Sequence, residues 1–400
     1  MKSAGLTFAI VAIGTLQAMA APPAIYNLGT LGGDHSTGNA INNSGQVTGS
    51  ARTPGGVANA FLYTPAPGGG GAMVNLGTLG GGSIGYAIND AGQVAGTSNR
   101  HVFLYTGTPG SGGVMHDLGT LYQGTDYVSG LNAAGQIVGR VWNTNWERHV
   151  GFLYSGTPGA GGAMVDLSLQ AIGEVRDIND AGQMTAHYWI YTPAPGGGWT
   201  KTNMGTLGGE DWQVDAKAIN NAGQVTGRSA TIPQSFSPPS RAFLYTGTPG
   251  SMLDLGTLPG GTGSEGLAIN AAGQIAGWSD MGGGFSQKRA FLYTGTPGVN
   301  GQMIDLNAWL DTNNPIEGAK WTLLEARGIN DYGLITGEGI FNDGPGGLSD
   351  GTRAFILDAS SLVPEPSSAM LLAVAGLGLL ARRRPVATSS PMSNKLKGAS

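Results

Sequence analysis

Apolar residues recur along the chain in short runs separated by glycine-rich turns, and three phrases of this pattern repeat. The first phrase is Ile or Leu, Asn, two variable residues and Gly, and it occurs seven times. Its asparagines are Asn42, Asn89, Asn132, Asn179, Asn220, Asn270 and Asn330, at intervals of 41 to 60 residues. A second phrase, Phe-Leu-Tyr or a variant, follows each copy. A third, Asp or Asn followed by Leu-Gly-Thr-Leu or a degraded form, precedes each copy. Recurrence at such intervals predicts an array of one supersecondary unit.

Each copy predicts about four short strands. In the second copy we expect strands at 84–88, 93–96 and 102–105, with an outer strand at 73–76. A turn at 89–92 joins the first two, and its glycine can take the positive φ of a bulged hairpin. The Pro/Gly-rich segments between the third and fourth strands are expected to be surface loops.

The third strand is apolar on both alternating faces, with Phe103 and Tyr105 on one and Val102 and Leu104 on the other. A sheet with two buried faces needs a neighbour on each side, and radially packed blades meet that condition. The chain also opens with a lone strand around Tyr26 and closes with one around Phe355. Pairing of these two would close a ring and remove an open edge. The sequence therefore predicts an all-β, seven-bladed propeller closed by its N-terminal strand, whereas an open stack of β-units is the alternative.

Both ends of the chain resemble targeting segments. Lys2, an apolar stretch and Ala18-Met19-Ala20 predict a signal peptide over 1–20,. Near the C-terminus, Pro364, Glu365 and Pro366 precede a short apolar run and the cluster Arg382, Arg383 and Arg384. The run is short for a membrane-spanning helix, but arginines can snorkel to the cytoplasmic side.

This order of features over 363–384 resembles the PEP-CTERM sorting signal. The resemblance implies a Gram-negative envelope, sorting by an exosortase, attachment to the inner membrane before processing, and a link to exopolysaccharide. A polar tail over 385–400 follows the arginines. The repeat domain is therefore expected over 21–362.

The three repeated phrases are similar to those of the HAF family of extracellular repeat proteins, named for a His-Ala-Phe triplet. His101-Val102-Phe103 keeps the histidine, whereas Arg241, Arg289 and Arg353 replace it before Ala-Phe. The resemblance implies an extracellular setting and no particular ligand or activity.

Charge and composition narrow the partners. The chain has 72 glycines and no cysteine, which removes disulfides, thiolate catalysis and cysteine-zinc sites,. Between the two targeting segments, 14 basic and 24 acidic residues give a formal charge of −10. Such a body argues against nucleic-acid binding and against broad capture of an acidic polysaccharide.

The repeated asparagines are best explained as structural turn residues, because asparagine in such a turn bonds its own backbone. The residues before Ala/Val-Phe (His101, Arg241, Arg289 and Arg353) either make bonds between blades or form a partly basic rim that grips a carboxylated sugar. Trp142 and Trp146 either pack between blades or stack on sugar rings. Trp189, which replaces the repeated phenylalanine in the fourth copy, is expected in the core.

The sequence shows no spacing typical of a catalytic or metal site. We therefore predict an exported, non-catalytic envelope or matrix protein without cofactor or metal, binding polysaccharide or a surface protein. The alternative is a carbohydrate-active propeller enzyme, a glycosidase or lyase, with dispersed acidic residues.

Overall fold

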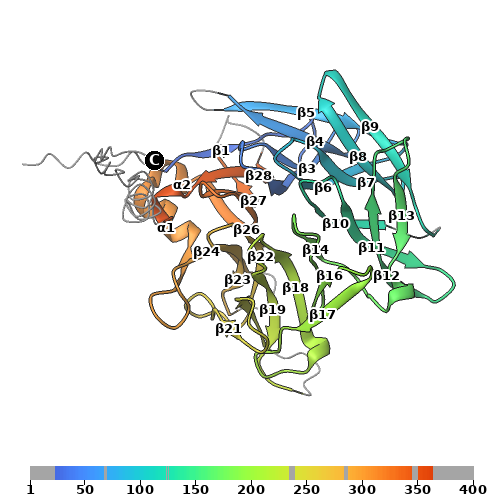
Figure 1. The fold of residues 1–400 in the computed structure, drawn as a ribbon. Coiled ribbons are helices and arrows are strands. Elements are labelled where there is room, and N and C mark those ends of the chain that lie inside the picture. Colours follow the sequence, from blue (N-terminus) through green and yellow to red (C-terminus); the bar gives the residue numbers. More distant parts are fainter. Residues whose placement is uncertain are drawn as a thin grey trace, which may run out of the picture.

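Seven four-stranded antiparallel sheets are arranged radially in the computed structural model (Figure 1). Residues of all seven sheets line a central channel. The structure describes residues 23–66, 70–122, 124, 126–233, 239–282, 287–344 and 350–363. The predicted signal peptide, the PEP-CTERM motif residues and the polar tail lie outside the described residues. Within the described residues, no helix is long and apolar enough to cross a membrane. The seven-bladed propeller predicted from the repeats is confirmed.

The blades follow one another along the chain, each built from the innermost strand outward. Blades 1 to 4 comprise β2 (Ser36–Ile41), β3 (Val47–Arg52), β4 (Ala58–Pro65) and β5 (Gly71–Gly77); β6 (Ser83–Ile88), β7 (Val94–Ser98), β8 (His101–Thr108) and β9 (Ser111–Gly119); β10 (Asp126–Leu131), β11 (Ile137–Asn143), β12 (Arg148–Ser155) and β13 (Ala163–Asp166); and β14 (Asp177–Ile178), β15 (Met184–Ala186), β16 (Trp189–Pro193) and β17 (Trp199–Asn203). Blades 5 to 7 comprise β18 (Val214–Ile219), β19 (Val225–Ala230), β20 (Ser240–Tyr245) and β21 (Met252–Asp254); β22 (Ser264–Ile269), β23 (Ile275–Asp280), β24 (Lys288–Thr294) and β25 (Gln302–Asp305); and β26 (Trp321–Ile329), β27 (Leu334–Phe341), β28 (Gly351–Asp358) and β1 (Ile25–Asn27). The strand expected at 73–76 as part of the second copy thus closes blade 1 as part of β5.

The last blade takes its outer strand from the start of the chain. β1 pairs antiparallel with β28, so that Asn27 lies opposite Phe355 and Tyr26 opposite Ile356. In Figure 1, β1 lies beside β28, where the two ends of the propeller meet. This pairing, which we call the clasp, covers the edge that β28 would otherwise expose.

The repeated phenylalanine forms the core between blades. Phe61, Phe103, Phe152, Phe243, Phe291 and Phe355 are all completely buried. Trp189, at the same place in blade 4, is only partly buried, and the Lys201 ammonium lies 4.5 Å from its ring centroid. The expectation that Trp189 belongs to the core is therefore only half right, because the ring packs at the margin of the buried cluster of blade 4.

A β-bulge interrupts the innermost strand of every blade except blade 4. In blade 1 the register shifts between Gly38 and Ala40, which leaves Asn39 as the extra residue. The bulge brings the Thr37 carbonyl so close to the second strand that a Cβ on Gly49 would lie 1.9 Å from its oxygen. Blade 4 has Ala186 where the other blades have this glycine, and its innermost strand shows no bulge. Glycine in the second strand therefore goes together with the bulge.

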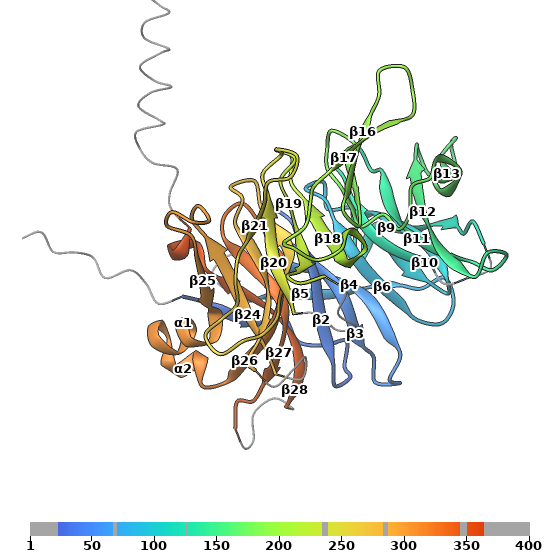
Figure 2. The ribbon, with the colours of Figure 1, turned by 90° about the horizontal axis from the view of Figure 1, so that it is seen from below.

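Two short helices between blades 6 and 7 were not expected from the repeat pattern. Helix α1 (Leu306–Asn313) begins where the Asp305 carboxylate accepts from the backbone N–H groups of Asn307 and Ala308, and α2 (Pro315–Gly318) follows it,. Leu306 and Leu310 of α1 join the buried cluster that includes Ile25 of β1. Figure 2 shows both helices at the margin of the ring. They account for the longest interval between repeats and leave the blade order unchanged.

Candidate functional site

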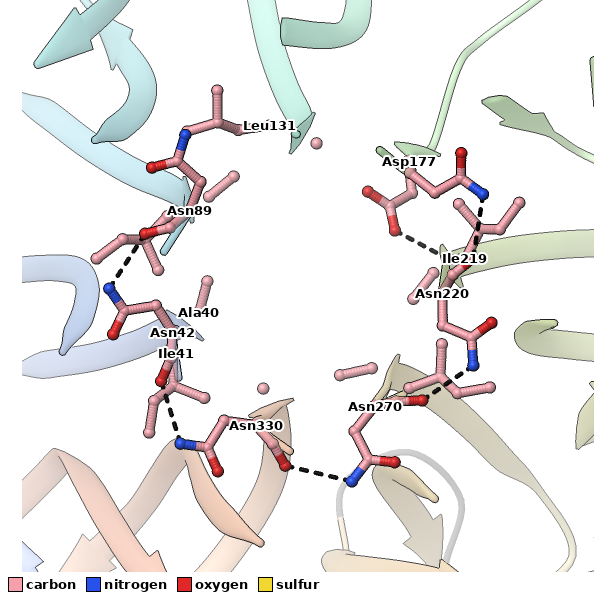
Figure 3. Close-up of a pocket in the computed structure, with 18 of the residues that line it drawn as sticks. Ala40, Ile41, Asn42, Asn89, Leu131, Asp177, Ile219, Asn220, Asn270 and Asn330 are labelled. Atoms are coloured by element: carbon pink, nitrogen blue, oxygen red, sulfur yellow. Dashed lines mark hydrogen bonds between the residues drawn. The ribbon is translucent and has the colours of Figure 1, made fainter. Parts of the chain in front are cut away.

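The seven repeated asparagines form a hydrogen-bonded ring around the channel (Figure 3). Within each turn the side-chain oxygen accepts from the backbone; Asn42 Oδ1, for example, accepts from the Gln46 N–H at 2.9 Å. Each Nδ2 also donates to the main-chain oxygen of the next asparagine around the ring, at 2.9 to 3.2 Å. The sequence thus predicted the hydrogen bonds within each turn but not those between neighbouring blades. Each asparagine also ties its blade to the next one.

Beside the asparagine ring lies a tier of small residues with one exception. Six blades place Ala or Gly two positions before the asparagine, whereas blade 4 places Asp177 there. The Asp177 carboxylate accepts from the backbone N–H of Ile178 at 2.8 Å and of Ile219 at 2.9 Å. Burial raises the pKa of Asp177 to about 7, although both backbone bonds oppose this. In Figure 3 its carboxylate projects toward the channel.

One position further from the asparagines, seven side chains form what we call the basal ring: Asn39, Tyr86, Ser129, Arg176, Lys217, Leu267 and Arg327. In six blades this residue is the bulged one. A bulge re-aims side chains and is common beside functional sites. Members of this ring line the channel beside the asparagines and also a second cavity of about 370 Å³ on the side away from the asparagines, which we call the basal mouth. That volume lies within the range of small-ligand pockets.

Basic side chains line the basal mouth, and acidic side chains outside the lining form ion pairs with them. Its lining includes Arg140, Arg176, Lys217 and Arg327, and among the described residues it includes no carboxylate. The acids pair with these cations both within a blade and between blades. Arg176 lies 3.2 Å from Glu174 of its own blade and 3.0 Å from Asp215 of blade 5.

The ion pairs behind the basal mouth form a belt of charges, which continues through blades 5 to 7. Lys217 joins Asp215 to Glu265 of blade 6, and Arg327 joins Glu325 to Glu338. Burial raises the pKa of Asp215, but Lys217 and Arg176 outweigh it and hold that pKa below its usual value. The same balance, set by Arg327, lowers the pKa of Glu338. Asp215 and Glu338 therefore stay ionised at neutral pH and help to hold Arg176, Lys217 and Arg327 beside the mouth.

The opposite wall of the basal mouth is uncharged and partly aromatic. Asn39 and Tyr86 come from blades 1 and 2, and Tyr127 and Ser129 from blade 3. The Arg140 guanidinium lies 4.9 Å from the Tyr127 ring centroid and also bonds Glu174 at 2.9 Å. Arg140 thus connects the aromatic wall to the charged wall. One side can take a sugar ring or another planar group, and the other an anion.

The structure does not bring the four predicted rim residues into the basal mouth. His101, Arg241 and Arg289 each bond the acidic residue of the third phrase in their own blade, namely Asp117, Asp254 and Asp305, at 2.9 to 3.0 Å. Arg353 is 3% exposed and donates to the main-chain oxygen of Asp34. These contacts correspond to the structural alternative, with one difference: the bonds of His101, Arg241 and Arg289 run within a blade.

Trp142 and Trp146 lie on blade 3, where β11 ends and its following loop begins, and both are partly exposed. Trp142 packs edge-on against His149, which in turn packs edge-on against Tyr127 of the basal mouth. Trp142 is therefore connected to the basal mouth through His149, whereas the Trp146 ring contacts Arg148.

The basal ring was missed in the sequence, although a signal was present. The asparagine is invariant over seven copies and the residue before it is always Ile or Leu, yet the residue three positions before it is different in almost every copy. A variable position inside an otherwise constant phrase indicates a side chain that is not needed for packing or for the turn. Its direction could not be known without the bulge.

In the described part of the chain, no three acidic or histidine side chains gather in a way suited to a metal ion. No family model matches the sequence, and no curated protein matches it. Among solved structures, the chain is similar to virginiamycin B lyase from Staphylococcus aureus, with 12% identity over 84% of this chain and 98% of that one, at a TM-score of 0.46. It also aligns with Trypanosoma rangeli sialidase in complex with sialic acid, with 10% identity over 82% and 62% and a TM-score of 0.36. Aleuria aurantia lectin in complex with α-methyl-L-fucoside aligns with 11% identity over 80% and 94%, and a TM-score of 0.29. Such distant likenesses carry no argument about the basal mouth.

Proposed function

We propose that this protein is an exported, non-catalytic binding protein of the cell envelope or extracellular matrix, and that its basal mouth holds a carboxylated sugar. The observation that carries the proposal is the basal ring, where three cations are held on one side and an uncharged, partly aromatic wall on the other. Arginine pairs bidentately with carboxylates, and a tyrosine ring offers an apolar face to a sugar. The overall negative charge of the body makes this capture local to the mouth.

The targeting segments support the location of the proposed function. The apolar stretch before Ala20 and the Pro-Glu-Pro motif with its arginine cluster favour export and sorting by an exosortase,. Mass spectrometry of the protein recovered from cells, with and without the sorting enzyme, tests this. A mature chain beginning at Ala21 and loss of the C-terminal segment that depends on the enzyme are expected; an intact N-terminus would contradict export.

Binding can be tested by calorimetric titration with galacturonate oligomers, using neutral galactose oligomers as the ligand control. Arg176→Gln and Arg327→Gln each remove one cation of the mouth, and each is expected to weaken binding at least about tenfold. Arg241→Gln is the matched control, because Arg241 pairs with Asp254 away from the channel. Equal affinity in all three variants would overturn the assignment of the mouth.

The alternative, a carbohydrate-active enzyme, makes a different prediction. Asp177 is the acidic residue in the small-residue tier of the channel, so turnover of any polysaccharide that disappears in Asp177→Asn would contradict the non-catalytic proposal. Binding of the galacturonate oligomers without release of shorter products supports it.

A further inference from the structure

A line of aromatic and basic side chains leads outward from the basal mouth over blade 3. It begins at Tyr127, continues through His149, whose ring centroid is 6.0 Å away, and reaches Trp142 5.0 Å further on. The outer end of this line lies at the turn between β11 and β12, where Arg148 pairs with Asn143 next to the Trp142–His149 pair and its guanidinium lies 4.9 Å from the Trp146 ring centroid. These residues come from β10, β11, β12 and the loop between the last two. We refer to this set as the blade 3 track.

The loop that carries Trp146 is held in a fixed shape. Asn143 is 1% exposed, and its side-chain oxygen accepts from the backbone N–H groups of Asn145 at 2.9 Å and Trp146 at 3.1 Å. Trp142 is 36% and Trp146 48% exposed, so large apolar rings are presented to solvent from an ordered turn. A binding surface that is already ordered loses little conformational entropy when a ligand arrives.

A cation lies on an aromatic ring at each end of the track. Arg140 lies over Tyr127 near the mouth, and Arg148 lies over Trp146 at the outer end. A sugar ring needs a flat apolar partner, and a carboxylate needs a guanidinium. The repetition of both, at the mouth and beyond it, fits a ligand in which acidic sugar units repeat.

We propose that the ligand is an acidic polysaccharide chain, and that blade 3 carries a second binding surface for it. One acidic sugar of the chain occupies the basal mouth, and the following sugars lie over the blade 3 track toward Trp142 and Trp146. This inference rests on the proposed function and deepens it from a single carboxylated sugar to a chain of several.

The test compares chain lengths. Galacturonic acid and its hexamer are titrated into the protein, and the hexamer is expected to bind about 10- to 100-fold more tightly, since tethered units add contacts at high effective concentration. In a Trp142→Ala, Trp146→Ala double variant this advantage is expected to fall to less than about threefold. Affinity for the monomer should stay within about twofold.

Trp212→Ala is the matched control, because Trp212 is 69% exposed and lies outside the track. It should keep the full length advantage. Poly-L-glutamate, an acidic chain without sugar rings, should bind the parent and the double tryptophan variant equally. If it does, the track recognises charge alone and the inference is wrong.

Two further results separate this inference from the proposed function. Equal binding of monomer and hexamer, abolished by Arg176→Gln, would overturn the chain inference and leave the proposed function intact. Failure of both ligands to bind would overturn both.

Discussion

The side-chain Nδ2 of Asn330 donates a hydrogen bond to the main-chain oxygen of Asn42, 288 residues earlier, at 3.1 Å. The next residues repeat the connection, since Asp331 N–H donates to Asn43 Oδ1 at 3.0 Å. Blade 7 is thus joined to blade 1 at the channel as well as through β1 at its periphery. The ring is closed at both its inner and its outer radius.

The inner closure predicts that Asn330→Asp destabilises the propeller. Aspartate keeps the acceptor oxygens but loses the donor to the Asn42 main-chain oxygen, which then keeps only its hydrogen bond from the Gly45 N–H and faces a carboxylate instead of an amide. We expect a loss of about 1–3 kcal/mol in the free energy of unfolding, measured by urea denaturation. Asn99→Asp, at an exposed position, is the control and should be close to neutral. Equal stability of the two variants would show that the asparagine ring does not contribute to closure.

The outer closure predicts that a charge in β1 opens the ring. Ile25 is 7% exposed and packs in the same cluster as Leu357. Ile25→Asp buries an unpaired carboxylate there, and we expect a loss of about 3 kcal/mol or more, with earlier proteolysis near the clasp. Ile316→Asp is the matched control, because Ile316 is 75% exposed. A melting temperature unchanged in Ile25→Asp would mean that β1 is dispensable for folding.

The stability of the protein should fall as the pH rises from about 4 to about 7. Asp126 is 1% exposed, and burial raises its pKa to about 7, against smaller opposing effects of Thr120 and His101. In that pH window the unfolded chain ionises the carboxyl while the folded protein keeps it protonated. Stability from this group is therefore complete below about pH 4 and lost as the pH passes through 7, by about 2–4 kcal/mol.

Asp126→Ser should remove the part of this dependence that comes from Asp126, whereas Asp177, whose pKa burial also raises to about 7, keeps its own part. Blade 1 has Ser36 at the same place, where its hydroxyl donates to the Gly29 carbonyl at 2.6 Å and accepts from the Ala354 N–H at 3.0 Å. We expect the Asp126→Ser variant to be more stable than the parent at pH 8 and similar to it at pH 4. Exposed Asp350→Ser should leave the pH profile unchanged. Parallel profiles of the parent and the Asp126→Ser variant would contradict the raised pKa.

Leu267 of blade 6 lies in the basal ring between Lys217 of blade 5 and Arg327 of blade 7. A cation at this position is predicted to strengthen binding. Leu267→Arg would place a guanidinium between the charges of Lys217 and Arg327, and we expect about 3- to 10-fold tighter binding of galacturonate oligomers with a steeper salt dependence. Leu267→Gln is the uncharged control and should leave the affinity nearly unchanged. Weaker binding by the arginine variant, with the fold intact by circular dichroism, would place the ligand elsewhere.

Much of the fold was readable because each repeat carries the same local chemistry. Gly45, at φ +74°, shows why the Asn-x-x-Gly turn ends in glycine,. The buried Phe-Leu-Tyr strand and the phase offset of the two chain ends predicted radially packed blades with a closing strand. Helix α1 was missed because it lies in the single long interval between repeats, where the periodic signal stops. The register of the clasp was also one residue from the expected pairing of Tyr26 with Phe355.

The candidate site was only partly predictable. Trp142 and Trp146 were singled out by type and position, but Arg241 and Arg289 pair with acids of their own blades and Arg353 is buried against Asp34. The cations of the basal mouth do not stand out in the sequence, since Arg176, Lys217 and Arg327 each lie in a different repeat, at least 41 residues apart along the chain.

By itself, the sequence determined the number of blades, the turns and the closing strand, because these depend on short-range patterns that recur in every copy. Only the tertiary structure decided which side chains meet. Closing the ring brings the same position of seven distant repeats together, and in six of the blades a β-bulge, which follows from strand pairing, turns that position toward the channel. The convergence of Arg176, Lys217 and Arg327 on one mouth is a property of the closed ring and of no single repeat.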